Sequence, residues 1–143
     1  MATRNGSAEW KGDLGSGSGR LTVGKGAWEG DYSFASRFEE GEGTNPEELL
    51  AAAHAACFSM ALSHMLAEHG HEPRSVRTTA KVQLRNVGGA PTIQQIELET
   101  EGDVPSIDEA HFREHAEEAK AGCAVSRALG GVEEINLSAR LAS

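Results

Sequence analysis

The sequence is poor in cysteine and in basic side chains, and both shortages limit what the protein can be. Two cysteines in 143 residues are too few for a disulfide scaffold. In a reducing compartment such cysteines are usually free, catalytic or redox-active. Thirteen Lys and Arg residues against 22 Asp and Glu give a net charge of −9. An acidic chain without a basic run is a poor partner for nucleic acid or for an anionic membrane surface.

The sequence also lacks several motifs that would indicate a class of protein. No Cys-x-x-Cys or His-Glu-x-x-His spacing predicts a metal site, and no glycine-rich phosphate loop predicts a nucleotide cofactor. His54 and Ser59 interrupt the best apolar run, which falls short of the roughly 20 apolar residues of a membrane span. The first residues contain no apolar stretch typical of a signal peptide. We therefore expect a cytoplasmic protein with no metal, no cofactor and no membrane partner.

The longest apolar segment predicts a long central helix. Asn45 is a good N-cap, Pro46 suits the first helical position, and acidic residues follow in the first turn. Gly70 can end the helix in a left-handed conformation, so we predict a helix from Pro46 to His69. Apolar side chains cover nearly its whole circumference from Leu49 to Leu62, which predicts burial on all sides. Because the rest of the chain is short and polar, a second copy of the chain is expected to supply part of that burial.

The first third of the chain is rich in Gly and Ser and predicts short strands. β-type segments at Ala8–Trp10, Arg20–Val23 and Trp28–Phe34 are separated by turn signals, which is typical of a three-stranded meander.

The second half predicts more strands and one further long helix. Apolar and polar residues alternate over Val76–Arg85 and Ile96–Glu99, as in antiparallel strands with one wet face. A capping box of Ser106 and Glu109 predicts a charged surface helix over Ile107–Ala121. Ile135–Leu141 predicts the last strand. The order β-β-β-α-β-β-α-β predicts one α+β domain over residues 1–143, with antiparallel β layers around a buried central helix.

Cys57, near the middle of the predicted helix, is the first candidate for chemistry. A cysteine in an Ala-rich helix is most simply a small buried hydrophobe. Reactivity requires a thiolate, and an apolar site disfavours the thiolate unless a positive charge approaches it. Arg37, before the helix, is the candidate cation, although it could equally be an ordinary solvated arginine.

Two further residues leave alternatives open. Glu47 either belongs to a site or is a first-turn acid that the helix dipole favours. It precedes Cys57 by ten residues, about 15 Å along a straight helix, so it reaches the cysteine only if the helix entrance bends back or an arginine bridges the gap. Cys123 follows a predicted helix end, which predicts an exposed and flexible position. His54, inside the apolar run, is most simply a core or interface histidine.

Two segments carry a resemblance to a known family. Tyr32–Ser63, with TNPEELLAAAHAACFSMAL around Cys57, and Ala119–Leu129, with AGCAVSRAL around Cys123, resemble the OsmC/Ohr family of osmotically induced and organic-hydroperoxide-resistance proteins. The second segment favours the OsmC branch. One departure is Ala124, where proline is frequent in the family.

The resemblance implies a thiol peroxidase that reduces organic hydroperoxides. Cys57 matches the peroxidatic cysteine, Cys123 the resolving cysteine, Arg37 the arginine that holds the thiolate, and Glu47 the acid that pairs with that arginine. The resemblance also implies an OsmC-like fold, an intertwined homodimer, a Cys57–Cys123 disulfide, and a dithiol reductant that is a lipoylated protein for some members. The rival interpretation is a non-catalytic dimer of the same fold that binds an apolar ligand. A third is a structural module with incidental cysteines.

Overall fold

The computed structural model describes residues 1–143 and contains two compact units, Met1–Leu49 and Leu50–Ser143. The α+β class with β layers and a long central helix, predicted from the sequence, is confirmed, and the structure contains two three-stranded sheets. The single-domain description stays a prediction.

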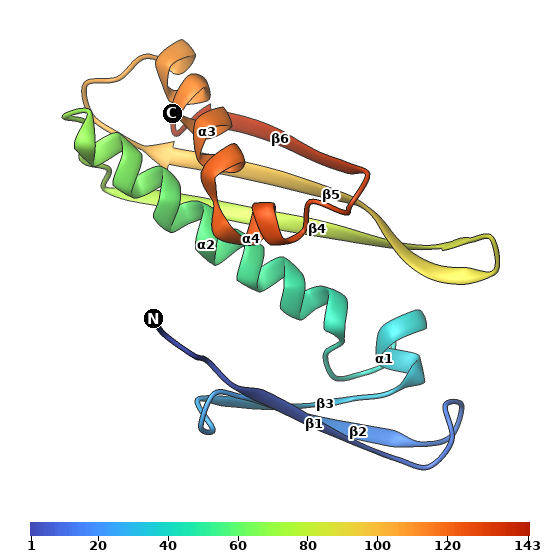
Figure 1. Ribbon diagram of the computed structural model, residues 1–143. Helices are drawn as coiled ribbons and strands as arrows, with labels where there is room; N and C mark the ends of the chain where they lie inside the picture. The colour runs from blue at the N-terminus through green and yellow to red at the C-terminus, as the bar shows by residue number, and fades with distance from the viewer. The chain divides into compact units, whose positions relative to one another are not determined.

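The first unit is built on an antiparallel sheet. Strands β1 (Gly6–Lys11), β2 (Ser18–Val23) and β3 (Trp28–Tyr32) pair in the order β1-β2-β3, which confirms the predicted meander (Figure 1). Trp10 on β1 lies beside Tyr32 on β3, with ring centroids 5.4 Å apart. The sheet thus gathers aromatic side chains from its two outer strands.

A short helix, α1 (Phe34–Phe38), follows β3 and was not predicted. The third strand of the predicted meander ran to Phe34. In the structure β3 ends at Tyr32, because Ser33 caps α1. The Ser36 backbone N–H donates to the Ser33 hydroxyl, and the Ser36 hydroxyl accepts from the Ser33 N–H. This capping box has serine at N3 instead of the usual Glu or Gln, and five residues are too few to show helical periodicity.

Helix α2 (Pro46–Glu68) confirms the predicted central helix and its end signals. The Asn45 side chain accepts a hydrogen bond from the Glu48 N–H at 2.8 Å, as expected of an N-cap. Gly70 has a φ of 83°, the left-handed conformation that ends a helix. Local side-chain chemistry therefore sets both ends of this helix.

The second unit contains a mixed sheet of β4 (Ser75–Val87), β5 (Ala90–Asp103) and β6 (Glu134–Leu141). β4 and β5 are antiparallel, as predicted, but β5 and β6 are parallel, so purely antiparallel pairing was wrong for the last strand. The reason is the crossover between them, α3 (Glu109–Gly122) and α4 (Ala124–Ala128). Two strands joined through a helical crossover can run in the same direction.

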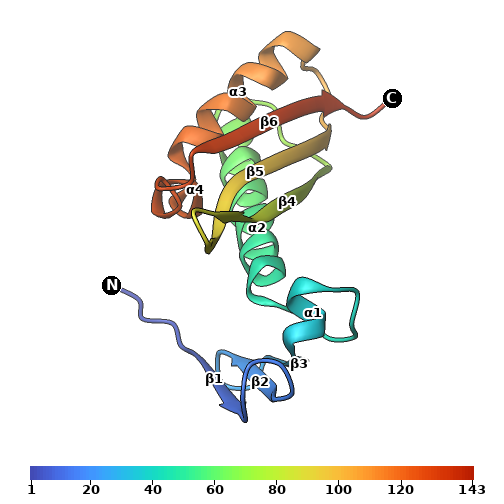
Figure 2. The ribbon, with the colours of Figure 1, turned by 90° about the vertical axis from the view of Figure 1, so that its right-hand side faces the viewer.

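Helices α2 and α3 pack on the same face of this sheet, and the core lies between them and the strands (Figures 1 and 2). Phe58, Leu62 and Leu66 of α2 meet Leu98 of β5 and Phe112 of α3 in one buried cluster. Full burial of such side chains contributes about 1.5–3 kcal/mol each. Packing on α2 therefore stabilises the second unit.

The burial of α2 differs from the prediction. His54, Phe58, Leu62 and Leu66, spaced four residues apart, are each 0% exposed. The other side of the helix remains open, with exposed side chains at Ala52, Ala53, Ala56 and Met60. All-round burial is therefore wrong for a single chain, because the second unit packs against one side of the helix.

By length and composition alone, α2 is long and apolar enough to cross a membrane. The sequence had predicted no membrane span, because polar residues interrupt the apolar run. A helix at the core of a folded domain passes the same test. Here α2 places Phe58, Leu62 and Leu66 in such a core.

Helix α3 begins later than predicted and is only partly a surface helix. Its N-cap is Asp108, whose carboxylate accepts from the His111 N–H at 2.8 Å, so the predicted capping box at Ser106 was wrong. Ser106 has a φ of 66°, whereas an N-cap needs extended backbone. Phe112 and Ala116 are buried on the sheet side of the helix, while the charged residues face outward.

Candidate active site

Arg37 and Glu47 form a bidentate ion pair within the first unit. The Arg37 Nη2 donates to Glu47 Oε1 at 2.8 Å, and Nε donates to Oε1 at 3.1 Å and to Oε2 at 3.3 Å. The Glu47 side chain is 8% exposed and that of Arg37 is 35% exposed. Two donors in the plane of the guanidinium fix its orientation against the carboxylate.

The loop between α1 and α2 brings this pair together. The Ser36 hydroxyl donates to the Thr44 carbonyl at 2.7 Å, and the Asn45 side-chain amide donates to the Ser36 carbonyl at 2.9 Å. These bonds tie the end of the loop back to α1. As a result, Arg37 in the last turn of α1 faces Glu47 in the first turn of α2.

An apolar pocket of about 420 Å³ lies beside Arg37 in the same unit. Its lining is mainly aromatic and aliphatic and includes Trp10, Leu14, Tyr32, Phe34 and Phe38. The guanidinium carbon of Arg37 lies 5.3 Å from the centroid of the Phe38 ring. The pocket therefore combines an apolar wall with one oriented cation.

Cys57 and Cys123 meet in the second unit, and both are free thiols. Cys57 lies on α2 and is partly buried, whereas Cys123, between α3 and α4, is 1% exposed. Cys123 belongs to the buried core cluster, Cys57 packs against that cluster, and the Cys57 side chain is close enough to help lower the pKa of the Cys123 thiol. The predicted exposure of Cys123 was wrong, because α4 folds back and places its sulfur in the core cluster.

The start of α4 supplies polar contacts to the buried Cys123 sulfur. Burial raises the pKa of the Cys123 thiol, but hydrogen bonds to its sulfur outweigh burial and hold the pKa below its ordinary value of 9.0. They come from the Ser126 backbone N–H, the Cys57 thiol, the Ser126 hydroxyl and the Val125 N–H. Cys123 is the N-cap residue of α4, although its side chain makes no capping hydrogen bond.

A buried His54–Ser126 pair adjoins the cysteines. The His54 Nε2 and the Ser126 Oγ lie 2.6 Å apart, and both residues are buried. Burial lowers the pKa of His54 below its ordinary value of 6.5, which favours the neutral ring. The sequence had marked His54 as a core histidine but missed Ser126. No local signal was available, because His54 and Ser126 are 72 positions apart in the sequence.

The structure thus joins the four predicted site residues in two pairs. Arg37 and Glu47 meet in one unit, and Cys57 and Cys123 meet in the other. Phe58, the neighbour of Cys57 on α2, is a core residue with 0% exposure. No group of three His, Cys, Asp or Glu side chains converges in the arrangement of a metal site.

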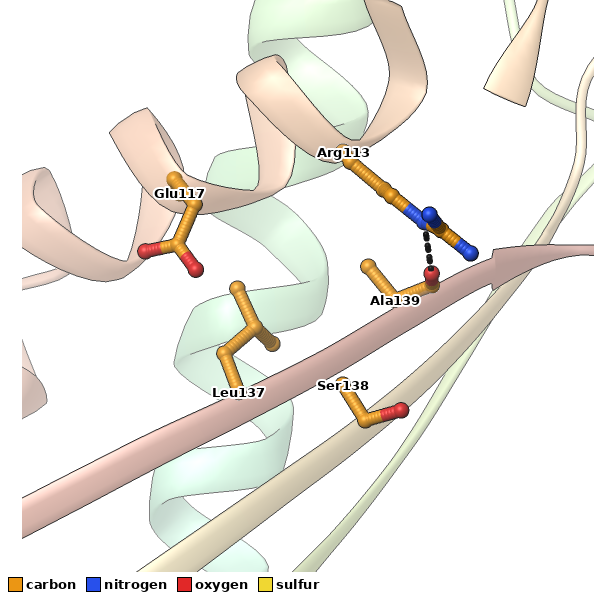
Figure 3. Close-up of a pocket in the computed structure, with 5 residues that line it drawn as sticks. All are labelled: Arg113, Glu117, Leu137, Ser138 and Ala139. Carbon is orange, nitrogen blue, oxygen red and sulfur yellow. Dashed lines mark hydrogen bonds between the residues drawn. The ribbon is translucent and has the colours of Figure 1, made fainter. Parts of the chain in front are cut away.

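A second cavity, of about 270 Å³, lies between α3 and β6 and contains neither cysteine (Figure 3). Arg113 reaches from α3 toward β6 and donates through Nε to the Ala139 carbonyl at 3.2 Å (Figure 3). That arginine also pairs with Glu109 on its own helix. Its guanidinium already has partners, so this cavity offers no reactive group.

Comparison with known proteins gives a consistent family. Residues 39–138 match the family described as OsmC-like protein. The chain is 47% identical to the peroxiredoxin OsmC of Escherichia coli (strain K12) over 141 residues, covering 98% of this chain and 97% of that protein. It is 32% identical to an organic hydroperoxide resistance protein of Xanthomonas axonopodis pv. citri, with 68% of each chain covered.

A solved structure shares the fold. The crystal structure of an organic hydroperoxide resistance protein OsmC from Legionella pneumophila superimposes with a TM-score of 0.78 at 23% identity, covering 98% of this chain and 99% of that one. The family match spans most of the chain and includes Cys57 and Cys123. This protein therefore belongs to the OsmC-like family.

Proposed function

We propose that the protein is a thiol-dependent peroxidase that reduces organic hydroperoxides to alcohols. The observation that carries this proposal is the contact between the free thiols of Cys57 and Cys123, which lie far apart in the sequence. Relatives named peroxiredoxin OsmC and organic hydroperoxide resistance protein support a peroxide-related redox activity. The non-catalytic binder has no use for two contacting free thiols.

The reaction begins at Cys57, the more accessible of the two thiols. Its thiolate attacks the distal oxygen of the hydroperoxide, the O–O bond breaks, and the alkoxide leaves and takes up a proton as the alcohol. Cys57 becomes a sulfenic acid. The Cys123 thiolate then attacks the Cys57 sulfur, forms the disulfide, and releases hydroxide, which is protonated to water. A dithiol reductant, which we propose is a lipoylated protein, restores both thiols by exchange.

The family resemblance assigns Arg37 and Glu47 the role of partners for the Cys57 thiolate, and the proposed mechanism adopts that role. A guanidinium stays charged throughout the neutral range and stabilises a nearby thiolate, and Glu47 fixes its orientation through the bidentate pair. The apolar pocket beside Arg37 suits the hydrocarbon part of an alkyl or fatty-acid hydroperoxide.

The functional unit is proposed to be a homodimer. The apolar face of α2 that one chain leaves open, around Ala52, Ala53, Ala56 and Met60, fits an identical face on a second copy. Small alanine side chains permit close approach of two helices at such a face. In the proposed homodimer, each chain covers the open face of α2 on the other chain.

The test compares hydroperoxide consumption by wild type and two cysteine variants. With cumene hydroperoxide and dihydrolipoamide, wild type is expected to turn over and Cys57→Ser is expected to lose activity. Cys123→Ser should still allow one oxidation of Cys57, but its recycling is expected either to stop or to be diverted to the external thiol, because the sulfenic acid has no internal partner. Undiminished turnover by Cys57→Ser would remove this cysteine from the mechanism.

Thiol counting separates the peroxidase from the binder. One equivalent of organic hydroperoxide should consume both free thiols of each chain, since sulfenic acid formation is followed by disulfide formation. A protein that merely binds an apolar ligand keeps both thiols. Hydrogen peroxide at the same concentration is the matched control for the organic group, and we expect slower consumption with it.

A further inference from the structure

Two histidines meet where the end of α2 lies beside α3 (Figure 1). His69 follows the last residue of α2, and His115 lies near the middle of α3. Their ring centroids are 4.5 Å apart, and the ring planes are inclined at 43° to each other. His69 comes 12 residues after Cys57, which is about 18 Å along a helix. The histidine pair therefore lies outside the thiol site described above.

A hydrogen bond determines which nitrogen of His69 carries the ring hydrogen. The His69 Nδ1 lies 2.9 Å from the carbonyl oxygen of Met65. Because a carbonyl oxygen only accepts, Nδ1 must be the donor, and the lone pair of the neutral ring is on Nε2. Histidines that bind metal ions usually donate their other ring N–H to a backbone carbonyl or a carboxylate in this way. The His69 side chain is exposed, so an ion can reach it from solvent.

His115 has a ring nitrogen that the fold leaves without a partner. Its Nδ1 is buried and makes no hydrogen bond. A buried polar atom without a partner is unfavourable, and a bound ion is one of the explanations for such an atom in a native protein. The residue is only partly exposed, so the packing of α3 holds this ring beside that of His69.

Two other histidines of the second unit have carboxylate partners instead. The His64 Nε2 lies 3.5 Å from Glu68, and the His111 Nδ1 lies 2.7 Å from Asp108. Neither His69 nor His115 forms an ion pair, and each has the other imidazole as its neighbour. His64 and His111 are thus matched controls, since they lie on the same two helices without a second imidazole beside them.

The ligand set defines the class of ion. Imidazole nitrogen suits Zn²⁺, Ni²⁺ and Cu²⁺, whereas Mg²⁺ and Ca²⁺ take oxygen ligands. Metal–nitrogen bonds are about 2.0–2.1 Å long in zinc sites. Rings with centroids 4.5 Å apart are close enough for one nitrogen of each to reach a common ion. No third His, Cys, Asp or Glu side chain converges on the pair, so water must fill the remaining positions.

We propose that His69 and His115 bind a divalent late transition-metal ion at the junction of α2 and α3. The ligand atoms are the His69 Nε2, whose lone pair is free, and the His115 Nδ1, which has no other partner. The ion joins two elements of the second unit and stabilises its fold, because only the folded chain brings the two rings together. The site does not depend on the proposed peroxidase activity.

The first test measures Ni²⁺ binding by isothermal titration calorimetry. The double variant Cys57→Ser, Cys123→Ser serves as the background, because it removes the thiols that would also bind a metal ion. We expect one Ni²⁺ per chain, and His69→Gln or His115→Gln should each weaken binding at least about tenfold. His64→Gln and His111→Gln should leave the affinity unchanged. Absence of binding at millimolar Ni²⁺, or equal affinities in all four histidine variants, overturns the proposal.

A second set of measurements separates the loss of a ligand from a change in the fold. In the same background, 1 mM Ni²⁺ is expected to raise the urea midpoint at about 1 mM or tighter affinity, whereas 1 mM Mg²⁺ should not. The electron paramagnetic resonance spectrum of bound Cu²⁺ should show couplings from two nitrogens, and from one nitrogen in His69→Gln. An unchanged midpoint with Ni²⁺, or the same copper spectrum in His69→Gln with native circular dichroism, overturns the proposal.

Discussion

The Arg37–Glu47 pair gives the sharpest quantitative prediction. Arg37→Met leaves the Glu47 carboxylate, which is 8% exposed, without the two nitrogen donors that now contact it. Hydrogen bonds to charged groups contribute about 1.5–3 kcal/mol each, and loss of one partner from a buried pair costs about 3–5 kcal/mol. Because Arg37 is 35% exposed, solvent screens part of this interaction. We expect a loss of about 2–3 kcal/mol in the free energy of unfolding.

A double-mutant cycle isolates the pairwise energy. Glu47→Gln keeps the shape of the side chain and removes its charge, and the double variant removes both partners. We expect the sum of the unfolding free energies lost in the two single variants to exceed the loss in the double variant by about 2 kcal/mol. The reason is that the double variant has no unpaired charge at this site. Urea unfolding at one fixed protein concentration measures all four proteins, since assembly would otherwise change the midpoint.

The matched control is an exposed ion pair in the same unit. Arg20 donates to Asp31 at 2.7 Å, a distance as short as in the buried pair, but both side chains are largely exposed. Arg20→Met is expected to leave the unfolding midpoint nearly unchanged. If the Arg37 and Glu47 losses add within about 0.5 kcal/mol, the two residues are independent. The role given to Glu47 as the residue that orients Arg37 would then be refuted.

Three further predictions follow from packing, titration and assembly. Gly102→Ala is expected to lose about 1–3 kcal/mol of unfolding free energy in urea titration, because its Cβ would lie 2.5 Å from a ring carbon of Phe112. The control is Gly122→Ala, which has open space around it and should leave the unfolding free energy nearly unchanged. Burial lowers the pKa of His54 below 6.5, so the neutral ring stabilises the fold above that pH and this stabilisation is lost as the pH falls through the lowered folded value. The stability difference between wild type and His54→Gln, followed by urea unfolding, should therefore shrink below pH 6.5, and parallel curves would contradict the assignment. Ala56→Glu places a charge on the open face of α2 and is expected to yield monomers in sedimentation velocity, while a persistent dimer would exclude this face from the interface.

Local signals in the sequence were sufficient for the central helix and for the strands with clear alternation. The cap at Asn45 and the left-handed Gly70 act within one turn of the helix ends, so α2 was predicted nearly to the residue. Alternation of apolar and polar residues likewise predicted β4. Helix α1 was missed because its capping serines and short length leave no periodic pattern.

The functional residues divide in the same way. The resemblance around Cys57 and Cys123 indicated both cysteines, and it implied the Arg37–Glu47 pair that the structure contains. The contact between His54 and Ser126 was not predicted, since the two residues are distant in the sequence and meet through packing. The prediction that Cys123 is exposed was also wrong. It was based on the end of α3 alone and did not include the packing of α4, which follows Cys123.

The sequence by itself determined the helix ends, the strand periods, the acidic charge and the family, since each depends on neighbouring residues or on a contiguous motif. The tertiary structure alone decided that β6 runs parallel to β5, that α2 buries one face, and that Cys123 lies under α4 beside Ser126. These features depend on which surfaces exclude water against one another. That depends on contacts between residues far apart in the chain, which no local pattern contains.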